Sequence, residues 1–317
     1  MIRFVKNNEI NSQKWNETIE NSQFPTVFAT FELLNISVAP DSWCALILDD
    51  YVAVMPLPSR KKCGFNYIYH PFFVPQLGVF SKKPMSDELI CSFFNKVTEL
   101  YVLGDFVLNV GNLEFSKSFQ TISYYQLKLD EQYKILHQNF SKNTKRNIKN
   151  AESFQFNLKL ENDNIKSIIN LFKNNRGDCV EVSFTDEDYR KCIEIADYLN
   201  KENLIETYSA YTRNGKLSAG AIFVHDGKRV WFWFSGRDNT NSEGNPMFFL
   251  INEFIKRHSN TDITFDFNGS VNPGVARMYK SFGGTPYNIP IVNIYKNRFW
   301  KLTSYLRRMF KNKKRRS

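Results

Sequence analysis

Residues 263–284 read ITFDFNGSVNPGVARMYKSFGG, a strand-like run, a tight turn and a returning helix in one short stretch. The β-rich run ends at Asn268-Gly269, and the helix carries Tyr279-Lys280 before it closes on Gly283-Gly284. Strand ends in mixed sheets open into crevices where ligands bind. We therefore expect Asp266, near the strand end, and Lys280 to bring a carboxylate and an ammonium to one site. The alternative is an ordinary helix stop with a solvated lysine.

The composition indicates a globular protein of two domains. The chain has 317 residues, of which 42% are hydrophobic and 15% aromatic, enough for two cores of ordinary size. The N-terminus has no apolar run of signal-peptide length, and no uncharged run reaches the roughly 18 residues that a membrane span needs. We therefore expect a cytoplasmic protein. The five cysteines include no CxxC pair and the four histidines form neither HxxxH nor HExxH, so we expect no metal.

The positive charge is concentrated at the C-terminal end. Of the 42 Lys and Arg residues, ten lie in 296–317, which contains no acid, so the first 295 residues hold equal numbers of acids and bases. Within 297–317, apolar residues fall on one helical face and most basic residues on the other. Such a tail predicts peripheral binding to the anionic inner face of the cytoplasmic membrane. Nucleic-acid binding and a frayed polar tail are the alternatives.

Hydrophobic periodicity and turn residues predict the secondary structure. Helices are expected at 11–21, 26–36, 86–100, 139–152, 163–175, 186–199, 246–258 and 274–282. Strands are expected at 43–48, 51–57, 65–69, 105–110, 122–129, 204–212, 217–225, 229–236, 263–267 and 288–295. The order of helix, two hairpin-linked strands, a third strand, a helix and a strand occurs twice. The turn at Asp49-Asp50 corresponds to Asn214-Gly215, and helix 86–100 corresponds to 246–258, so we infer a duplicated, mixed α/β fold.

Three segments resemble the Fem-type branch of the GNAT acyltransferase superfamily, which includes FemAB-like and BioF2-like proteins. The first is the basic segment SKNTKRNIKNA at 141–151. The second is Phe234-Ser235-Gly236 with Asn245-Pro246, and the third is 265–270 with 279–283. Their order and spacing carry the resemblance, which covers about residues 1–295.

The resemblance implies two tandem GNAT-like domains, each a mixed, mostly antiparallel sheet flanked by helices. Residues 1–138 would form the N-terminal domain and 139–295 the C-terminal domain, with an interdomain basic helix at 139–152 and the basic tail at 296–317. The family transfers an acyl group from an activated carrier to an amine. The carrier is acyl-CoA, an acyl carrier protein or aminoacyl-tRNA. Because the chain lacks both the ordinary GNAT pyrophosphate loop and a long heptad insertion between 186 and 204, the choice of carrier stays open.

The resemblance also implies roles for particular residues. The Phe-Lys dipeptide of the family maps onto Tyr279-Lys280, which with Asp266 as a general base are the expected catalytic residues. For Asp266 the alternative is a carboxylate that caps the turn at 268–270. The family's phosphate-binding basic helix maps onto Lys145 and Arg146, for which a solvated face is the alternative.

Two further groups of residues complete the expected site. Arg237, Gly244 and Asn245 belong to the loop at 237–245 and are expected to bind the acyl carrier where a helix begins. A solvated loop is the alternative. Tyr69 and Gln76 are expected to line a substrate groove in the first half, with packing in an aromatic core as the alternative.

Three functions follow as hypotheses. The first is an N-acyltransferase that acylates the amine of a sugar- or lipid-linked cell-envelope intermediate, or another small amine acceptor. The second is an aminoacyl-tRNA-dependent aminoacyltransferase that acts on a peptidoglycan precursor. The third is a non-catalytic module held at the membrane by its tail.

Overall fold

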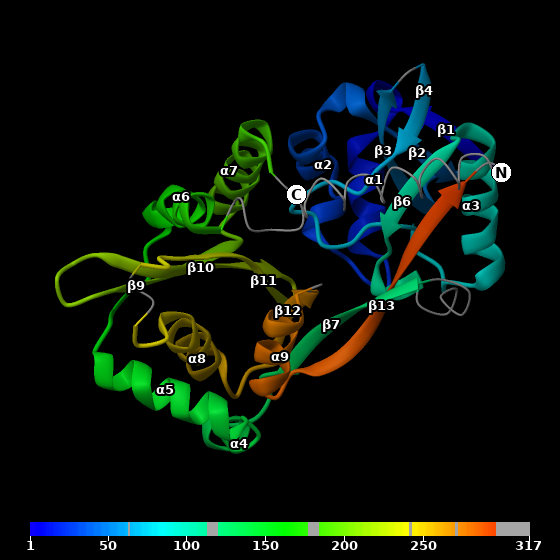
Figure 1. The fold of residues 1–317 in the computed structure, drawn as a ribbon. Coiled ribbons are helices and arrows are strands. Elements are labelled where there is room, and N and C mark those ends of the chain that lie inside the picture. Colours follow the sequence, from blue (N-terminus) through cyan, green and yellow to red (C-terminus); the bar gives the residue numbers. More distant parts are fainter. Residues whose placement is uncertain (63, 113–119, 177–183, 241–242, 270–271, 296–317) are drawn as a thin grey trace. The chain divides into compact units, whose positions relative to one another are not determined.

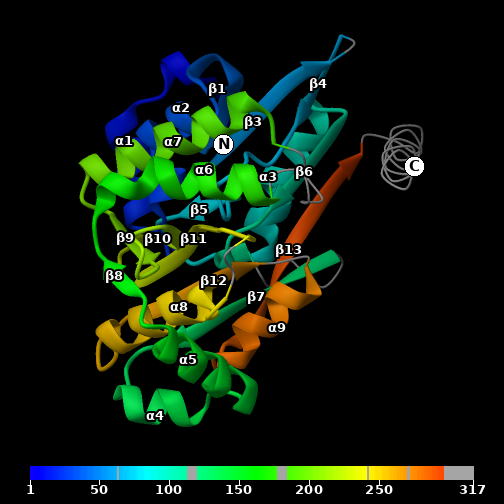
Figure 2. The ribbon, with the colours of Figure 1, turned by 60° about the vertical axis from the view of Figure 1, so that its left-hand side comes forward.

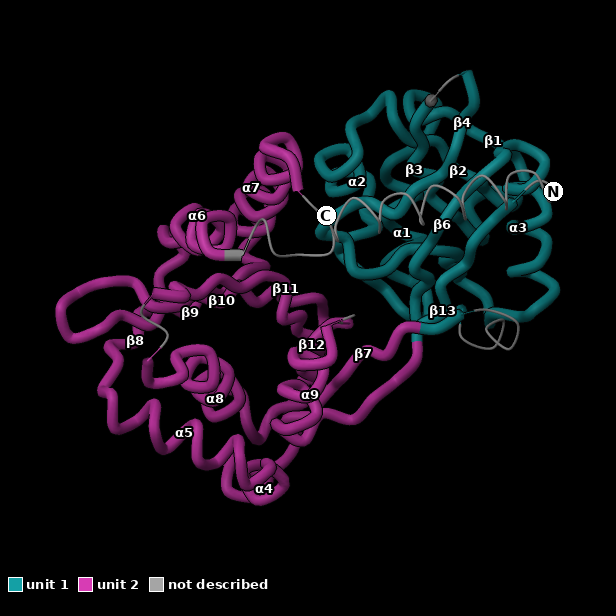
Figure 3. Tube along the Cα trace, in the orientation of Figure 1, with its two compact units in different colours: residues 1–121, 289–317 teal, residues 122–288 magenta. Residues whose placement is uncertain are grey.

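The computed structural model describes residues 1–62, 64–112, 120–176, 184–240, 243–269 and 272–295 (Figure 1). The chain divides into two compact units, one formed by 1–121 with 289–317 and the other by 122–288 (Figure 3). We call them unit 1 and unit 2 and describe each by itself. The expected domains, 1–138 and 139–295, remain a prediction, and the tail at 296–317 lies outside the described residues.

Unit 1 is a mixed sheet with helices. Its elements are β1 (Ile2–Lys6), α1 (Ser12–Glu20), α2 (Phe31–Ser37), β2 (Trp43–Leu48), β3 (Ala53–Lys62), β4 (Phe65–Ile68), β5 (Phe80–Ser81), α3 (Asp87–Leu100), β6 (Leu103–Val107) and the later part of β13 (Thr285–Tyr295). The strand order is β1-β2-β3-β4-β6-β13, with β5 beside β3. Only the β4–β6 pair in this order is parallel, and α3 connects its two strands.

Unit 2 is built in the same way. Its elements are β7 (Gln120–Lys128), α4 (Tyr133–Gln138), α5 (Lys142–Phe154), β8 (Asn157–Lys159), α6 (Ile165–Arg176), α7 (Asp186–Lys201), β9 (Ile205–Tyr211), β10 (Leu217–Asp226), β11 (Arg229–Arg237), α8 (Pro246–His258), β12 (Thr264–Gly269) and α9 (Pro273–Ser281). The strand order is β8-β9-β10-β11-β12-β7. The parallel pair is β11–β12, and α8 connects it.

The two units therefore share one pairing scheme, because each sheet runs through three antiparallel pairs, one parallel pair closed by a helix, and a final antiparallel pair. The inferred duplication and the mixed α/β class are confirmed. Each sheet ends on a strand from elsewhere in the chain, since β7 follows β6 in sequence but pairs with β12. In turn, β13 follows α9 but pairs with β6.

Helices cover both faces of the unit 2 sheet, with α6 and α7 on one side and α5, α8 and α9 on the other (Figure 1). The second side holds an aromatic core in which the rings of Phe223 and Phe254 stack with centroids 4.0 Å apart. On the first side α6 lies very close to the sheet, because a Cβ built on Gly236 would stand 2.5 Å from the carbonyl oxygen of Ile168. No described helix is both long enough and apolar enough to cross a bilayer.

Local signals in the sequence explain most helix ends and turns. Ser86 caps α3 by accepting a hydrogen bond from the Leu89 N–H, and Thr185 forms a capping box with Asp188 at the start of α7. Gly215 and Gly227 occupy left-handed conformations in the β9–β10 and β10–β11 turns.

The periodicity analysis missed β1, β5, β8 and α4. The three strands have two to five residues and α4 has six, too short for a period to register. These elements form because a neighbouring strand or a packed core stabilises them.

Gly236→Ala is expected to destabilise the protein by about 2 kcal/mol, because the new Cβ would meet α6 backbone rather than a movable side chain. Gly274→Ala is the control, since its Cβ meets the Asn272 side chain at 3.1 Å, and it should change stability by less than about 0.5 kcal/mol. Urea unfolding of the three proteins measures the difference. Equal stability of Gly236→Ala and wild type would show that α6 lies farther from the sheet.

Candidate active site

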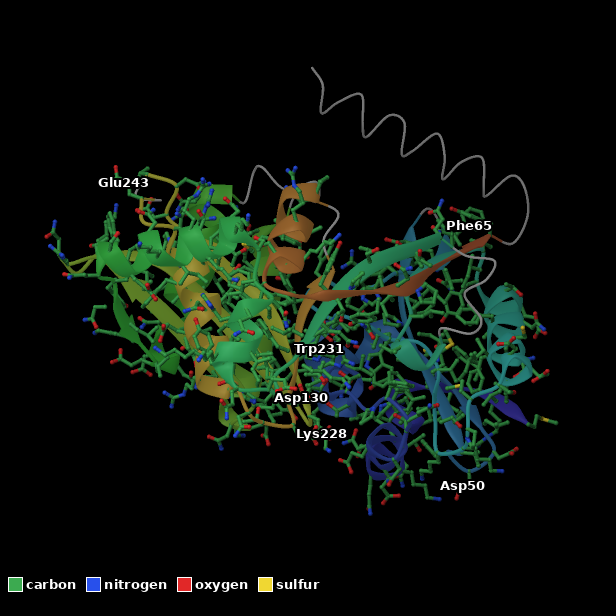
Figure 4. The ribbon with its side chains drawn as sticks, turned by 90° about the horizontal axis from the view of Figure 1, so that it is seen from below. Asp50, Phe65, Asp130, Lys228, Trp231 and Glu243 are labelled. Atoms are coloured by element: carbon green, nitrogen blue, oxygen red, sulfur yellow. The ribbon has the colours of Figure 1, made fainter. Side chains whose placement is uncertain are left out.

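The sheet of unit 2 opens between its two parallel strands. β11 and β12 pair over three residues, from Arg229 opposite Thr264 to Trp231 opposite Asp266. β11 continues to Arg237 and β12 to Gly269, so the strands part beyond Trp231, which is labelled in Figure 4. Irregularities accompany this parting, since the register of β11 shifts against β10 near Phe234 and that of β12 shifts against β7 after Asp266. Bulges of this kind bend a strand away from its neighbour.

The open end of β11 leads to the start of α8. Asn245 is the N-cap residue in a left-handed conformation, its side chain makes no capping hydrogen bond, and Pro246 occupies the first turn. Gly244 before it is buried against Phe154 of α5, whose ring would lie 2.5 Å from an added Cβ. Arg237 is exposed at the end of β11 and donates to the Asn239 side chain at 3.1 Å. Gly244 and Asn245 therefore lie at one helix N-terminus, where backbone N–H groups favour anions, while Arg237 lies at the end of the preceding strand.

Asp266 is the centre of a buried hydrogen-bond network. Its carboxylate is fully buried and accepts hydrogen bonds from the Arg229 guanidinium and the Tyr287 hydroxyl. It also accepts the Asn268 backbone N–H at 2.8 Å. Asn268 has a φ of 68°, so this bond stabilises the left-handed residue at the β12 register shift. Asp266 thereby connects β11, β12 and β13 at the point where the parallel strands separate.

The charge state of this network follows from burial. Burial raises the pKa of the Asp266 carboxyl above its ordinary value, while the Arg229 charge and the Tyr287 hydrogen bond oppose the shift. Burial also raises the pKa of Tyr287, with the Asp266 charge acting in the same direction. Tyr287 is therefore protonated at neutral pH and donates to the carboxylate. With these partners in place, the geometry indicates a positioning role for Asp266.

Tyr279 and Lys280 lie on the other side of the sheet from Asp266. The Tyr279 ring stacks on Phe267 at 5.1 Å within the aromatic core, and Asp266 points away from that core because side chains alternate along β12. Lys280 is exposed on α9. The expectation that Asp266 and Lys280 form one site is therefore wrong. Their individual catalytic roles remain predictions.

Lys280 lies instead beside the start of α5. The Ser141 N–H donates to the Ser281 carbonyl at 2.9 Å, and the Thr144 hydroxyl donates to the Ser281 hydroxyl at 2.7 Å. Lys145 donates to the Gln138 carbonyl at 2.8 Å, and the exposed Arg146 donates to the Asn143 side chain at 2.7 Å. Lys145 and Arg146 are thus near Lys280.

Gly244 is at the far end of α5, because it packs on Phe154. The 13 residues of α5 span about 18 Å at roughly 1.5 Å per residue. Lys145 and Arg146, in the first half of α5, and Gly244, against its last residue, are therefore separated along this helix.

In unit 1 the corresponding gap between parallel strands is filled. β4 pairs with β6 over two residues, and Leu77 then bridges to Leu108 and donates its N–H to the Val107 carbonyl at 3.0 Å. Two residues after Leu77, the Val79 carbonyl accepts hydrogen bonds from the side chains of Asn109 and Asn112, and the Val79 N–H donates to Asn112. The expected groove residues belong to this region, with Gln76 buried and the Tyr69 ring packed under the Arg60 guanidinium at 4.1 Å. Their role in substrate binding remains a prediction.

The sequence analysis missed Arg229 and Tyr287. Arg229 follows the Asp226-Gly227 turn and is 37 residues from Asp266, and Tyr287 lies 21 residues beyond Asp266. An arginine that opens an otherwise apolar strand was the available signal, because a buried strand with one cation predicts a buried acid partner.

A second polar cluster surrounds Glu206, which accepts hydrogen bonds from His225 at 3.1 Å, His258 at 2.9 Å and Tyr208 at 2.9 Å. Both histidines direct Nε2 at the same carboxylate oxygen, so each ring donates from that atom. Among the described residues no group of three or more His, Cys, Asp or Glu side chains is arranged to hold a metal ion.

Asp266→Asn is expected to destabilise the protein by about 3 kcal/mol, because it leaves Arg229 without its counter-charge next to the core. Asp262→Asn removes the partner of Lys228 at the surface, where both side chains are 82% exposed, and should leave stability unchanged. Urea unfolding at neutral pH measures both. An equally small loss of stability in Asp266→Asn and Asp262→Asn would argue against the buried network.

Glu206→Gln tests the second cluster through pH. Burial alone would raise the pKa of Glu206, but the hydrogen bonds from His225 and His258 outweigh it and hold the pKa below 4.5. Because the pKa is lower in the folded protein, the Glu206 carboxylate stabilises the folded state above about pH 4.5, and this contribution is lost as the pH falls further. The variant should therefore be about 2 kcal/mol less stable than wild type at about pH 5, with the gap narrowing toward about pH 3. A gap that widens on acidification would contradict this.

Comparison with known proteins identifies the fold and the domain type. Residues 138–281 match the acetyltransferase (GNAT) domain family. No curated protein sequence matches the chain. The crystal structure of FemX is 12% identical, covers 92% of this chain and 98% of its own, and has a TM-score of 0.66.

Two further structures have the same fold. L-PGS from Bacillus licheniformis is 10% identical with a TM-score of 0.54, over 93% of this chain and 95% of its own. The C-terminal domain of a putative lysylphosphatidylglycerol synthetase from Agrobacterium fabrum is 8% identical with a TM-score of 0.55, over 91% of this chain and 95% of its own. The resemblance to Fem-type proteins is confirmed at the level of the fold. Residues 138–281 thus match a GNAT-type acetyltransferase domain, which supports an acyltransferase, and the chain as a whole has the fold of FemX.

Proposed function

We propose that this acyltransferase moves an acyl group from acyl-CoA or an acyl carrier protein to the amine of a sugar- or lipid-linked cell-envelope intermediate. We place the reaction in unit 2, where β11 and β12 part. The single observation that carries this proposal is that β11 extends six residues past its last pair with β12. A strand edge without a neighbour presents backbone N–H and carbonyl groups to a ligand.

The chemistry needs these backbone groups. The amine nitrogen attacks the carrier's acyl carbon, a new carbon–nitrogen bond forms, and the carbon–sulfur bond to the carrier breaks. The amine loses a proton, and the carrier leaves as a thiol. Negative charge develops on the acyl oxygen during attack, and N–H donors of 232–237 stabilise it when they face that oxygen. Asp266 fixes the position at which this strand edge begins, because its hydrogen-bond partners connect β11 to β12 and β13.

The acyl carrier binds beside the α8 N-terminus. The phosphate of CoA or of a carrier protein's prosthetic arm is an anion, and a helix N-terminus stabilises anions through its free N–H groups and its dipole. Asn245 is the N-cap residue of this helix, and the exposed Arg237 ends β11, the strand that precedes it in the chain. Gly244 keeps the loop against Phe154, which fixes the approach to the helix.

The acceptor binds along α5. Lys142, Arg146 and Lys149 are exposed at positions i, i+4 and i+7, so they form one stripe along the helix. None of the three makes an ion pair with an acid in the described parts of the chain. Lys280 extends the positive surface at the start of the helix. Such a surface suits an acceptor that carries phosphate, as sugar- and lipid-linked envelope intermediates do.

Aminoacyl-tRNA is the alternative donor. The observation that favours it is the same basic stripe, because a polyanionic RNA also binds unpaired cations. One structure of the same fold is named a putative lysylphosphatidylglycerol synthetase. Dependence of turnover on charged tRNA rather than on acyl-CoA would select this alternative.

Mass spectrometry of envelope precursors, from cells with and without the chain, tests the proposed function. The proposal expects an acyl-bearing precursor that disappears when the chain is absent and returns with the wild-type gene. Identical precursor masses in both cells would contradict it.

Charge reversal at Arg146 tests the acceptor surface. We expect Arg146→Glu to lower kcat/KM for the acceptor about tenfold or more, because one charge-assisted contact is lost and a repulsion is added. Lys166→Glu is the control, since Lys166 is also exposed but lies on α6, which covers the opposite face of the sheet. An equal effect of the two substitutions would contradict a specific role for α5.

A further inference from the structure

The β3–β4 hairpin of unit 1 carries features that the proposed reaction does not use. Its strands pair from Ser59 opposite Ile68 to Lys62 opposite Phe65. The hairpin extends beyond the other elements of unit 1 in two views (Figures 1 and 2). Phe65, the first residue of β4, and Asp50, which precedes β3, are both labelled in Figure 4 and lie far apart there. The hairpin tip is therefore a projecting end of the sheet.

One face of this hairpin is aromatic. Phe65, Tyr67 and Tyr69 alternate along β4 and its extension, so their side chains share a face. Phe65 near the tip is 49% exposed, the highest value after Met1 among the large hydrophobic side chains that the structure describes in unit 1. Tyr67 and Tyr69, farther from the tip, are half-buried. Exposure and apolar character thus both increase toward the tip.

Positive charge surrounds the aromatic face. Arg60 pairs across the hairpin with Tyr67, and its guanidinium lies 4.1 Å above the Tyr69 ring. Lys61 alternates with Arg60 and so points from the opposite face of the hairpin. Both cations are exposed, and neither forms an ion pair with an acid that the structure describes. The tip therefore presents cations on both faces.

From the tip inward, the hairpin presents an apolar ring, then tyrosines flanked by cations, and this order matches the layers of a membrane surface. A single exposed apolar side chain is ordinary in proteins. A phenylalanine at a projecting tip, with tyrosines set back from it and cations on both sides, follows the order of acyl chains, interface and anionic headgroups. In a stacking platform for nucleic acid, successive bases stack on successive aromatic rings, whereas here Tyr67 and Tyr69 are half-buried.

We propose that the β3–β4 hairpin inserts its tip into the interface of a membrane rich in anionic phospholipid. Phe65 enters the acyl-chain boundary, Tyr67 and Tyr69 lie at the headgroup level, and Arg60 and Lys61 bind lipid phosphates. This docking site is separate from the acyl-transfer site and does not depend on the proposed reaction.

Amide hydrogen exchange of the full chain tests the proposal at the hairpin itself. The amides of 59–68 should exchange more slowly when vesicles of phosphatidylglycerol and phosphatidylcholine are added, and pure phosphatidylcholine vesicles should have little effect. Unchanged exchange at 59–68 with anionic vesicles overturns the proposal. Slowing by uridine monophosphate but not by vesicles also overturns it, because the aromatic face would then bind nucleotides.

Vesicle flotation gives the energetic test. Phe65→Ser should reduce partitioning onto anionic vesicles about fivefold, since an inserted phenylalanine is lost. Lys61→Glu should reduce it by about fivefold or more, because one cation near an anionic surface is worth about that factor. The controls are Phe4→Ser, at a side chain 41% exposed on β1, and Lys83→Glu, at another exposed lysine of unit 1. Partitioning reduced equally by the hairpin and control variants overturns the proposal.

Discussion

The structure of the candidate active site depends on one buried carboxylate. Asp266 is fully buried, and a buried charge is costly unless it is paired and hydrogen-bonded. Its partners come from three strands, the Arg229 guanidinium from β11, the Asn268 N–H from β12 itself and the Tyr287 hydroxyl from β13. They satisfy the carboxylate at the last residue where β11 and β12 pair. The strands therefore separate at a fixed point, and the edge of β11 beyond it is available for a ligand.

Within the described chain the two duplicated halves differ at this opening. Both units use the same pairing scheme, including a parallel pair closed by a helix. In unit 1 the segment around Leu77 closes the gap by pairing with Leu108, and asparagine side chains fix its backbone. In unit 2 β11 leads instead into Asn245 and α8. One architecture thus yields a filled half and an open half, which accords with the GNAT domain match in the second half of the chain.

The sequence predicted the fold better than the site, for a physical reason. Apolar periodicity and capping residues are local, so helices such as α3 and α7 were predicted within a few residues of their ends. Because these elements were predicted well, their repeated order in the two halves could be inferred from the sequence. Pairing between distant side chains is not local, and nothing near Arg229 identifies Asp266 as its partner. Alternation along β12 puts Asp266 on the face opposite Phe265 and Phe267, but the sequence could not show that α9 packs on the phenylalanine side, which separates Lys280 from the carboxylate.

The most direct measurement of the central claim is amide hydrogen exchange in ligand-free unit 2 of the intact chain. If Asp266 marks the point where the strands part, the amides of 232–237 that face β12 exchange as at an open strand edge. Those that face β10 exchange as slowly as the core, because β10 pairs with β11 as far as Arg237. Slow exchange of both sets would mean that β11 and β12 stay paired to their ends, which would contradict the account of the site.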